Sequence, residues 1–271
     1  MRHVGALRGH GVPGNQRLVH NGLHARDVSE RFSWLHFTDL HAGQKEQYLW
    51  PLIEAEVLED LQRLHARIGP IDAIFFTGDL VQAGHSDEFG LCDQILDRVC
   101  ETLASLGSQP ALLATPGNHD LVRPGSLAGA VLAAEAWERN AVLREDFWSS
   151  PNGELRKGVA ESFGHWRTWW DANRGDRVEE YKEGLLPGDY RATLTCRGLR
   201  IGVLSVNTAF LQLRGGDLQG QLTLDLRQVG GAFPDGIPLW AADHDVTFLL
   251  THHPESWLDQ RGKAALRTDL L

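Results

Sequence analysis

The sequence has little cysteine and no long apolar run, and both absences argue against whole classes of protein. Its 271 residues contain three cysteines, Cys92, Cys100 and Cys196, and no Cys-x-x-Cys pair. An odd number of scattered cysteines argues against a disulfide framework and predicts a reducing, cytoplasmic environment. No segment reaches the roughly 18 apolar residues of a transmembrane helix, so we expect no membrane contact.

The first 30 residues also lack the apolar core of a signal peptide. They are rich in glycine, histidine and arginine and show no periodicity, which predicts a poorly ordered N-terminal extension over 1–30. The remainder, 31–271, is predicted to be the globular domain, since the chain is 42% hydrophobic and 23% charged. The formal net charge of -10 argues against broad, non-specific binding of nucleic acid, although a local basic groove would still allow it.

Three short apolar runs alternate with helical patterns in the first half of the chain. The runs are SWLHFT (33–38), AIFFT (73–77) and ALLAT (111–115). Between them, apolar residues recur at steps of three and four, from Leu49 to Ile68 and from Phe89 to Leu106. This order is typical of a parallel sheet with right-handed crossovers, and runs without alternation favour strands that are covered on both faces.

The segment 121–189 has a different character, because it is mostly helical in pattern and holds five of the nine tryptophans. We interpret it as an insertion packed beside the sheet, either a lid or a small helical subdomain with an aromatic core. Downstream, 190–196 and 199–206 predict a hairpin that turns at Arg197-Gly198, and VTFLL (246–250) predicts a last strand.

Polar residues follow four of the predicted strands at the point where each strand ends. They are Asp39 and His41 after the first strand, Asp79 after the second, Asn118, His119 and Asp120 after the third, and His252 and His253 after the last. Because the carboxyl ends of parallel strands meet at one edge of a sheet, we expect these four clusters to converge there.

Aspartate, histidine and asparagine, without cysteine, form a donor set that suits Mn, Fe or Zn. A carboxylate can bridge two such ions, and two ions about 3.5–4 Å apart can hold a hydroxide and clamp a phosphate during in-line attack. A histidine beside them can protonate the leaving oxygen or stabilise the transition state. Each short motif also occurs by chance, but their ordered combination at successive strand ends favours a functional site.

The motifs DLH, GDLV, GNHD and HHP, in this order, resemble those of the calcineurin-like metallophosphoesterase family. The resemblance covers about 33–125 and 200–254 and is most specific at GNHD. It implies an α/β fold: a metallophosphoesterase-like β-sandwich flanked by helices, with the mostly helical, tryptophan-rich insertion and a truncated C-terminal sheet. It also implies a hydrolase that cleaves phosphomonoesters or phosphodiesters through a hydroxide activated by two divalent metal ions.

The same resemblance implies a role for each matching residue. The first metal would be held by Asp39 and His41, both metals by Asp79, and the second metal by Asn118 and His252. His119 would be the catalytic histidine, oriented by Asp120. His253 would either support the second-metal ligands or face the phosphate. Arg123, shortly after GNHD, is a candidate phosphate contact, with a helix cap or a surface salt bridge as the alternative.

One family motif has no counterpart in the sequence. Family members carry a further strand that ends in GHxH, and no GHxH occurs before or after His253. We therefore expect a shortened member: a fragment of a longer protein, a frameshifted product or a degenerate relative. The alternative function is a module that binds metal or nucleotide without efficient catalysis and acts within a larger assembly.

The resemblance leaves the substrate open, since the family acts on phosphomonoesters, cyclic nucleotides, nucleic acids and phosphoproteins. A phosphoester is the expected partner, and nucleic acid or a nucleotide stays among the candidates. The insertion over 121–189 is the expected determinant of that choice.

Overall fold

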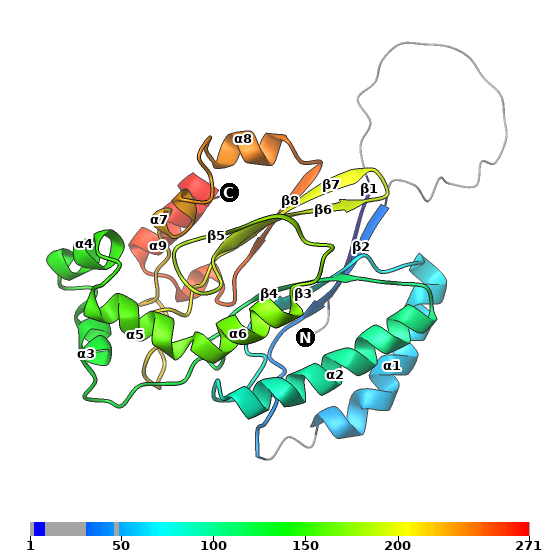
Figure 1. Ribbon diagram of the computed structural model, residues 1–271, viewed down its shortest axis with the longest axis horizontal. Helices are drawn as coiled ribbons and strands as arrows, with labels where there is room; N and C mark the ends of the chain where they lie inside the picture. Colours follow the sequence, from blue (N-terminus) through cyan, green and yellow to red (C-terminus); the bar gives the residue numbers. More distant parts are fainter. Residues whose placement is uncertain (1–2, 9–30, 46–48, 271) are drawn as a thin grey trace, which may run out of the picture.

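The computed structural model describes residues 3–8, 31–45 and 49–270, and these form two four-stranded sheets with helices on either side (Figure 1). The strands are β1 (His3–Arg8), β2 (Arg31–Phe37), β3 (Ala73–Thr77) and β4 (Ala111–Thr115) in the first sheet, and β5 (Glu179–Glu183), β6 (Tyr190–Cys196), β7 (Leu199–Ser205) and β8 (Val246–Leu250) in the second. The α/β fold class expected from the sequence pattern is confirmed.

The helices fall into three groups along the chain. The first group is α1 (Leu49–Ile68) and α2 (Ser86–Ser105). The second is α3 (Gly129–Ala136), α4 (Ala141–Ser149), α5 (Glu154–Ser162) and α6 (Gly164–Asn173). The third is α7 (Arg227–Gly230), α8 (Ile237–Ala242) and α9 (Gln260–Ala265), with a 3-10 turn at Glu255–Trp257 and a π turn at Leu266–Leu270.

β2, β3 and β4 are parallel neighbours, as the alternation of apolar runs and helical patterns predicts. α1 and α2 cover one face of this sheet. There, Leu35 and Ile74 of the strands and Leu61, Val99 and Leu103 of the helices form a buried cluster. β3 is buried over its whole length because strands flank it and side chains cover both faces, so its apolar run needs no alternation.

The N-terminal segment differs from expectation in one part. We expected residues 1–30 to lack order, but His3–Arg8 form β1 and pair antiparallel with β2. The physical reason is that β2 would otherwise present a row of unpaired backbone groups at the sheet edge. Residues 1–2 and 9–30 lie outside the described part of the chain, and the domain boundary at 31 stays a prediction.

The second sheet is built on the predicted hairpin. β6 and β7 pair antiparallel and turn at Arg197 and Gly198, whose φ angles are 48° and 81°. A two-residue type I′ turn requires positive φ at both central positions. β8 joins β7 in parallel, and β5 joins β6 antiparallel. Because β5 lies within 121–189, that segment is helical for most of its length but ends in a strand.

Aromatic side chains hold the two sheets face to face. The ring centroid of Phe248 on β8 lies 5.9 Å from that of Phe32, 5.1 Å from that of Trp34 and 4.9 Å from that of Phe75. Aromatic pairs at such distances contribute about 0.5–1.5 kcal/mol beyond their area burial. The expected sandwich therefore has an aromatic seam, and this seam fixes how the strand ends of the two sheets meet.

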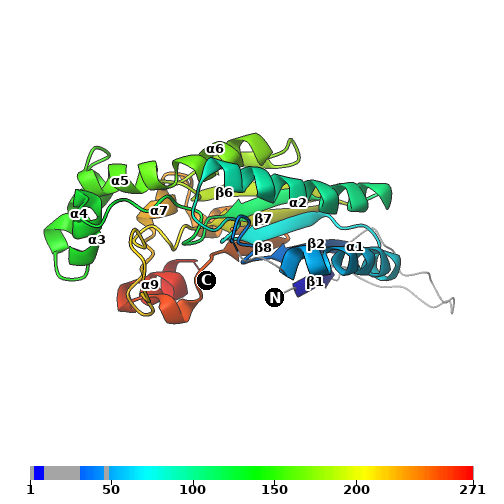
Figure 2. The same ribbon diagram turned by 90° about the horizontal axis from the view of Figure 1, so that it is seen from below.

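The insertion first leads away from the sheets to α3 and α4 and then returns through α5 to α6, which lies beside α2 (Figures 1 and 2). Its five tryptophans are all buried. Trp169 of α6 stacks on Phe89 of α2 with ring centroids 5.7 Å apart, and its indole N–H donates to Asp93 at 2.5 Å. These contacts agree with the interpretation of a helical subdomain with an aromatic core, whereas closure as a lid stays a prediction.

The three cysteines are free, with Cys92 and Cys196 buried and Cys100 partly buried. Burial raises the pKa of all three thiols, that of Cys196 to about 11, so each packs as a small protonated side chain. Within the ranges that the structure describes, no helix is long and apolar enough to cross a membrane.

The Arg197 guanidinium ties the hairpin of the second sheet to the first sheet. It donates to the carbonyls of Arg31 (3.0 Å) and Pro70 (3.3 Å) and pairs with the largely buried Asp72. We expect Arg197→Ala to lower the free energy of unfolding by about 2 kcal/mol, because the Asp72 carboxylate would stay buried without its cation. Urea denaturation measures this loss.

The matched control is Arg63→Ala, which removes an exposed pair with Glu59 on α1. Exposed pairs of this kind contribute little, so the urea midpoint of this variant should equal that of the parent protein. Equal midpoints for Arg197→Ala and Arg63→Ala would contradict the role given to Arg197.

Candidate metal centre

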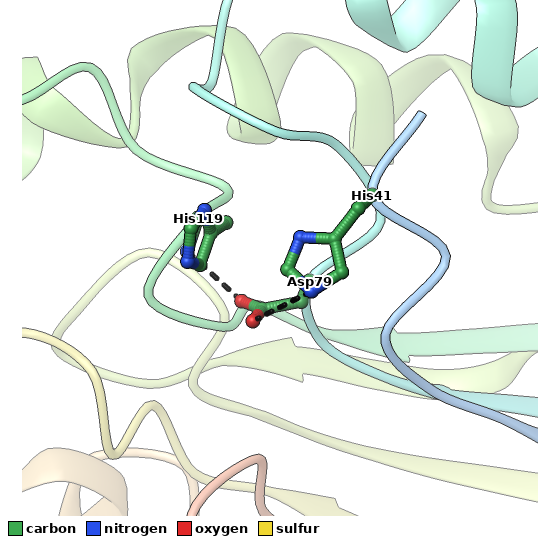
Figure 3. A group of neighbouring side chains, drawn as sticks. All are labelled: His41, Asp79 and His119. Carbon is green, nitrogen blue, oxygen red and sulfur yellow. Dashed lines mark hydrogen bonds and ion pairs between the residues drawn. The ribbon is translucent and has the colours of Figure 1, made fainter. Parts of the chain in front are cut away.

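The loops that follow β2, β3, β4 and β8 bring their polar residues together at one edge of the sandwich. Two groups of three side chains could each hold a metal ion, and within each group the candidate ligand atoms lie within 4.8 Å of one another. The groups are His41, Asp79 and His119, drawn in Figure 3, and Asp39, Asp79 and His252. The convergence expected from the strand ends is therefore observed, and Asp79 belongs to both groups.

The loop after β2 runs beside the loop after β3 and extends the parallel pairing of the two strands. The Asp39 N–H donates to the Gly78 carbonyl (3.1 Å), and the His41 N–H donates to the Asp79 carbonyl (2.9 Å). Asp39, His41 and Asp79 all have positive φ, at 57°, 49° and 54°. Such conformations cost about 1–3 kcal/mol each for residues with a side chain. These conformations accompany the convergence of the three side chains, whose candidate ligand atoms fall in the two groups above.

Gly117 makes room for the Asp79 carboxylate. A Cβ atom at Gly117 would lie 2.2 Å from Asp79 Oδ1 and 2.5 Å from the Asp79 backbone nitrogen. Gly78, with a φ of 89°, clears His252 in the same way, since a Cβ there would lie 2.6 Å from His252 Nδ1. Any larger residue at Gly117 would clash with Asp79, and any larger residue at Gly78 would clash with His252.

The two oxygens of the Asp79 carboxylate have different surroundings. The side chain is buried, with 4% of its residue surface exposed. Oδ1 accepts the backbone N–H of His119 at 2.9 Å. Oδ2 faces two imidazoles, with His252 Nε2 at 3.5 Å and His41 Nε2 at 3.7 Å. One oxygen is thus held by the backbone while the other points into the centre.

The tautomer of His252 follows from its partners. Its Nδ1 lies 2.8 Å from the Thr77 carbonyl, which only accepts, so Nδ1 carries the hydrogen. In the neutral ring, Nε2 then presents a lone pair toward Asn118 Oδ1 (3.2 Å) and Asp79 Oδ2 (3.5 Å). Three electron-rich atoms converge in this way, and a metal ion, a proton or a turned Asn118 amide would each relieve their repulsion.

His41 also has the properties of a metal ligand. Its Nδ1 is buried and has no hydrogen-bond partner among the described residues, and its Nε2 lies 3.9 Å from Asp39 Oδ1. Burial lowers the pKa of His41, although the Asp79 carboxylate acts in the opposite direction, so the neutral ring is favoured. A neutral imidazole is the form that binds metal.

The His119 ring stands edge-on to the His41 ring, with centroids 4.7 Å apart (Figure 3). Its Nδ1 lies 2.7 Å from the Gln82 carbonyl and therefore carries a hydrogen. This hydrogen bond fixes the ring and leaves Nε2 as its reactive nitrogen. Gln82 was not identified from the sequence, because a backbone carbonyl acts here and the residue type does not matter.

The expectation that Asp120 orients His119 is wrong. The Asp120 carboxylate is fully buried and accepts the backbone N–H groups of Val81 (3.0 Å) and Gly117 (2.7 Å). Burial and the nearby Asp79 charge raise the pKa of Asp120 to about 7. Asp120 joins the loop after β4 to the loop after β3, because backbone amides surround it on both sides.

Asn118 lies at the meeting point of both histidines of the HHP motif. Its Oδ1 is 3.2 Å from His252 Nε2 and 3.2 Å from His253 Nε2. His253 is 4% exposed, and burial together with the neighbouring His252 lowers its pKa to about 3. Both of its ring nitrogens have protein partners, since Nδ1 contacts Thr208 Oγ1. The contacts agree with a supporting role for His253, since both ring nitrogens are engaged with protein atoms and neither is free to contact a phosphate.

Arg123 is exposed beside this cluster. Its Nη2 donates to the Asn118 backbone carbonyl at 3.1 Å, which places the guanidinium next to the predicted second-metal ligand. Thr208 was missed in the sequence. It follows β7 as Asp79 follows β3, so the same strand-end argument applied to VLSVNT would have found it.

The donor set fits divalent metal ions. It combines two carboxylates, one amide oxygen and imidazoles, without a thiolate, and its acceptor atoms face one another with a buried, unpartnered nitrogen beside them. Oxygen and imidazole donors of this kind suit Mn, Fe and Zn.

We expect Gly117→Ala to weaken metal binding by at least about tenfold, since the new methyl group overlaps Asp79 Oδ1 and misplacing a ligand shell costs affinity on that order. Isothermal titration of the metal-free protein with Mn²⁺ measures the change. Gly125→Ala is the matched control, because Gly125 lies in the same loop with open space around it. Parent-like affinity in Gly117→Ala would contradict the clearance argument.

Comparison with known proteins places this geometry in a family. The family model described as calcineurin-like phosphoesterase matches residues 32–269. A search of curated proteins gave no match. The matched region includes all four loops of the candidate centre. The chain therefore belongs to the calcineurin-like phosphoesterase family, whose chemistry is the metal-dependent hydrolysis of phosphoesters.

Proposed function

We propose that this protein hydrolyses phosphomonoester or phosphodiester bonds with two divalent metal ions, Mn, Fe or Zn. Asp39 and His41 would hold the first ion, Asn118 and His252 would hold the second, and Asp79 would contact both. The observation that supports this most directly is the surroundings of Asp79 Oδ2, which faces His41 on one side and His252 on the other. A carboxylate oxygen between two imidazoles is the arrangement that a bridging ligand needs.

When bound, two divalent ions supply a water-derived nucleophile at neutral pH and compensate the charge that develops on the phosphoryl group. The chain fixes the ligands beforehand: the His119 N–H holds Asp79, the Thr77 carbonyl holds His252, and strained loops hold Asp39 and His41. Such preorganisation avoids rearrangement during the reaction.

His119 is the proposed proton donor to the leaving oxygen. The Gln82 carbonyl accepts from Nδ1, which aligns the ring. Nε2 is then the nitrogen that gives up a proton. The exposed Arg123 guanidinium, anchored on the Asn118 carbonyl, is the proposed contact for a substrate phosphate oxygen.

The substrate is proposed only as a phosphoester, with nucleotides and nucleic acid among the candidates. α3 and α5 of the insertion line a cavity of about 440 Å³, and Arg123 lines the same cavity. This supports the proposal that the insertion over 121–189 selects the substrate.

Hydrolysis of p-nitrophenyl phosphate and bis(p-nitrophenyl) phosphate by the Mn²⁺-loaded protein tests the proposal. We expect activity that a chelator abolishes. His119→Ala should lower kcat by about 10²–10⁴-fold with metal still bound, because it removes general acid catalysis. Asp79→Asn should lose both activity and metal.

The control variant is His244→Ala, which removes a histidine that contacts Thr193 and the Trp240 carbonyl at the other end of β8. It should retain parent activity. Equal rates in all four proteins would overturn the catalytic assignment. Metal binding without hydrolysis of either ester would instead favour the non-catalytic, metal-binding module.

A further inference from the structure

Thr208 and His253 contact each other twice beside Asn118, a residue of the proposed second-metal site. Thr208 is 1% exposed and follows β7, while His253 follows β8. Thr208 Oγ1 lies 3.0 Å from the His253 backbone nitrogen and 3.0 Å from His253 Nδ1. On the far side of the ring, Nε2 lies 3.2 Å from Asn118 Oδ1. One threonine hydroxyl therefore reaches Asn118 through a single imidazole.

Counting hydrogens assigns the direction of each contact. The hydroxyl oxygen accepts the His253 backbone N–H and has one hydrogen of its own to donate. His253 is buried and touches no carboxylate in the described part of the chain, so the neutral ring with one N–H is favoured. Within the described residues, His253 Nδ1 is the acceptor that the Thr208 O–H reaches, so Nδ1 carries no hydrogen. The one N–H of the ring is then on Nε2 and faces Asn118, whose oxygen is the atom that can accept it.

The other orientation of the Asn118 amide shows which hydrogen bonds the Thr208–His253 pair prevents. An asparagine amide can turn over and exchange its oxygen and its NH₂ group. A turned Asn118 would donate to the Nε2 lone pair of His252 and, in the other His253 tautomer, to His253 Nε2 as well. These hydrogen bonds would satisfy both rings and block the nitrogen of His252. When His253 carries its hydrogen on Nε2, the turned Asn118 amide would instead bring its NH₂ group, a donor, against the His253 N–H, which is also a donor.

The position of Thr208 is itself fixed by a buried polar network. The Asn207 N–H donates to Asp189 Oδ1 (2.7 Å), and the Ala209 N–H donates to Asn207 Oδ1 (2.8 Å). Gln228 Nε2 donates to the Asn207 carbonyl (3.0 Å) and to Asp189 (3.1 Å). The Thr208 backbone is thus held on both sides, and the hydroxyl keeps its direction toward His253.

We propose that Thr208 is a positioning residue for the second metal ion: through His253, it keeps the Asn118 amide turned with its oxygen toward His252 and Asp79. The inference rests on the proposed two-metal function and extends it to a residue outside the four motifs. Thr208 touches neither metal nor substrate in this scheme. It acts on metal affinity by excluding the amide orientation that competes with the ion.

The first test compares Thr208→Val, which removes the hydroxyl at similar volume, with Thr208→Ser, which keeps it. Mn²⁺ binding to each metal-free protein is measured by isothermal titration. We expect Thr208→Val to bind the second ion about 10- to 100-fold more weakly than the parent protein, the usual cost of disturbing the hydrogen bonds that orient a metal ligand, and to keep the first ion. Thr208→Ser should stay within about threefold of the parent.

The matched control is Thr193→Val. Thr193 is also fully buried in the second sheet, and its hydroxyl contacts His244 Nε2 at 2.9 Å at the other end of β8. This variant loses the same type of Thr–His contact and should bind both ions as the parent does. Thermal unfolding of the metal-free proteins should show similar losses for Thr208→Val and Thr193→Val, which separates a structural effect from a metal effect.

The outcomes separate this inference from the proposed function. Two tight ions in both the parent and Thr208→Val would overturn the inference alone, as would equal losses in Thr208→Val and Thr208→Ser. A parent protein that binds no ions would overturn both proposals. A parent with one ion would contradict the two-metal function. The Val and Ser variants would still decide whether Thr208 matters for that ion, with no difference between them counting against the inference.

A second measurement needs no variant and no metal. Long-range ¹H–¹⁵N correlation spectra of the metal-free protein report which ring nitrogen of each histidine carries hydrogen. We expect the Nε2–H tautomer for His253 and the Nδ1–H tautomer for His252. The Nδ1–H tautomer at His253 would overturn the inference.

Discussion

The Asp79 carboxylate is the group on which the rest of the centre depends. Its Oδ1 is held by a backbone N–H from the loop after β4, and its Oδ2 faces one histidine from the loop after β2 and another from the loop after β8. No other side chain joins both ligand groups in the described residues. Its position requires a positive φ at Asp79 and the missing side chain of Gly117, so backbone strain and a glycine together make room for the carboxylate where the two groups meet.

The packing of the two sheets determines whether the candidate centre can form, because its side chains come from both sheets. Asp39, His41 and Asp79 follow strands of the first sheet, while His252 follows β8 of the second. Phe248, four residues before His252, packs against three aromatic rings of the first sheet. The seam that stabilises the fold thus also sets the distance between His252 and Asp79. The stability of the fold and the geometry of the candidate centre are therefore coupled through the same aromatic rings.

The sequence was informative where a single residue type or run determines the outcome. The apolar run of β3 and the Arg197-Gly198 turn required no tertiary information, and the strand-end rule brought Asp39, Asp79 and His252 to one edge. It was not informative about hydrogen-bond partners. Asp120 binds backbone amides and His119 binds the Gln82 carbonyl, and such backbone groups exist at every position. β1 was missed because an edge strand forms through its partner, and its own six residues contain little signal.

Electron paramagnetic resonance of the Mn²⁺-loaded protein tests the bridging role of Asp79 most directly. Two Mn²⁺ ions that share one carboxylate lie about 3.5–4 Å apart and couple magnetically. The account predicts the spectrum of a coupled pair in the parent protein and of isolated or free Mn²⁺ in Asp79→Asn. A parent protein that shows only isolated Mn²⁺ at saturating metal would contradict it.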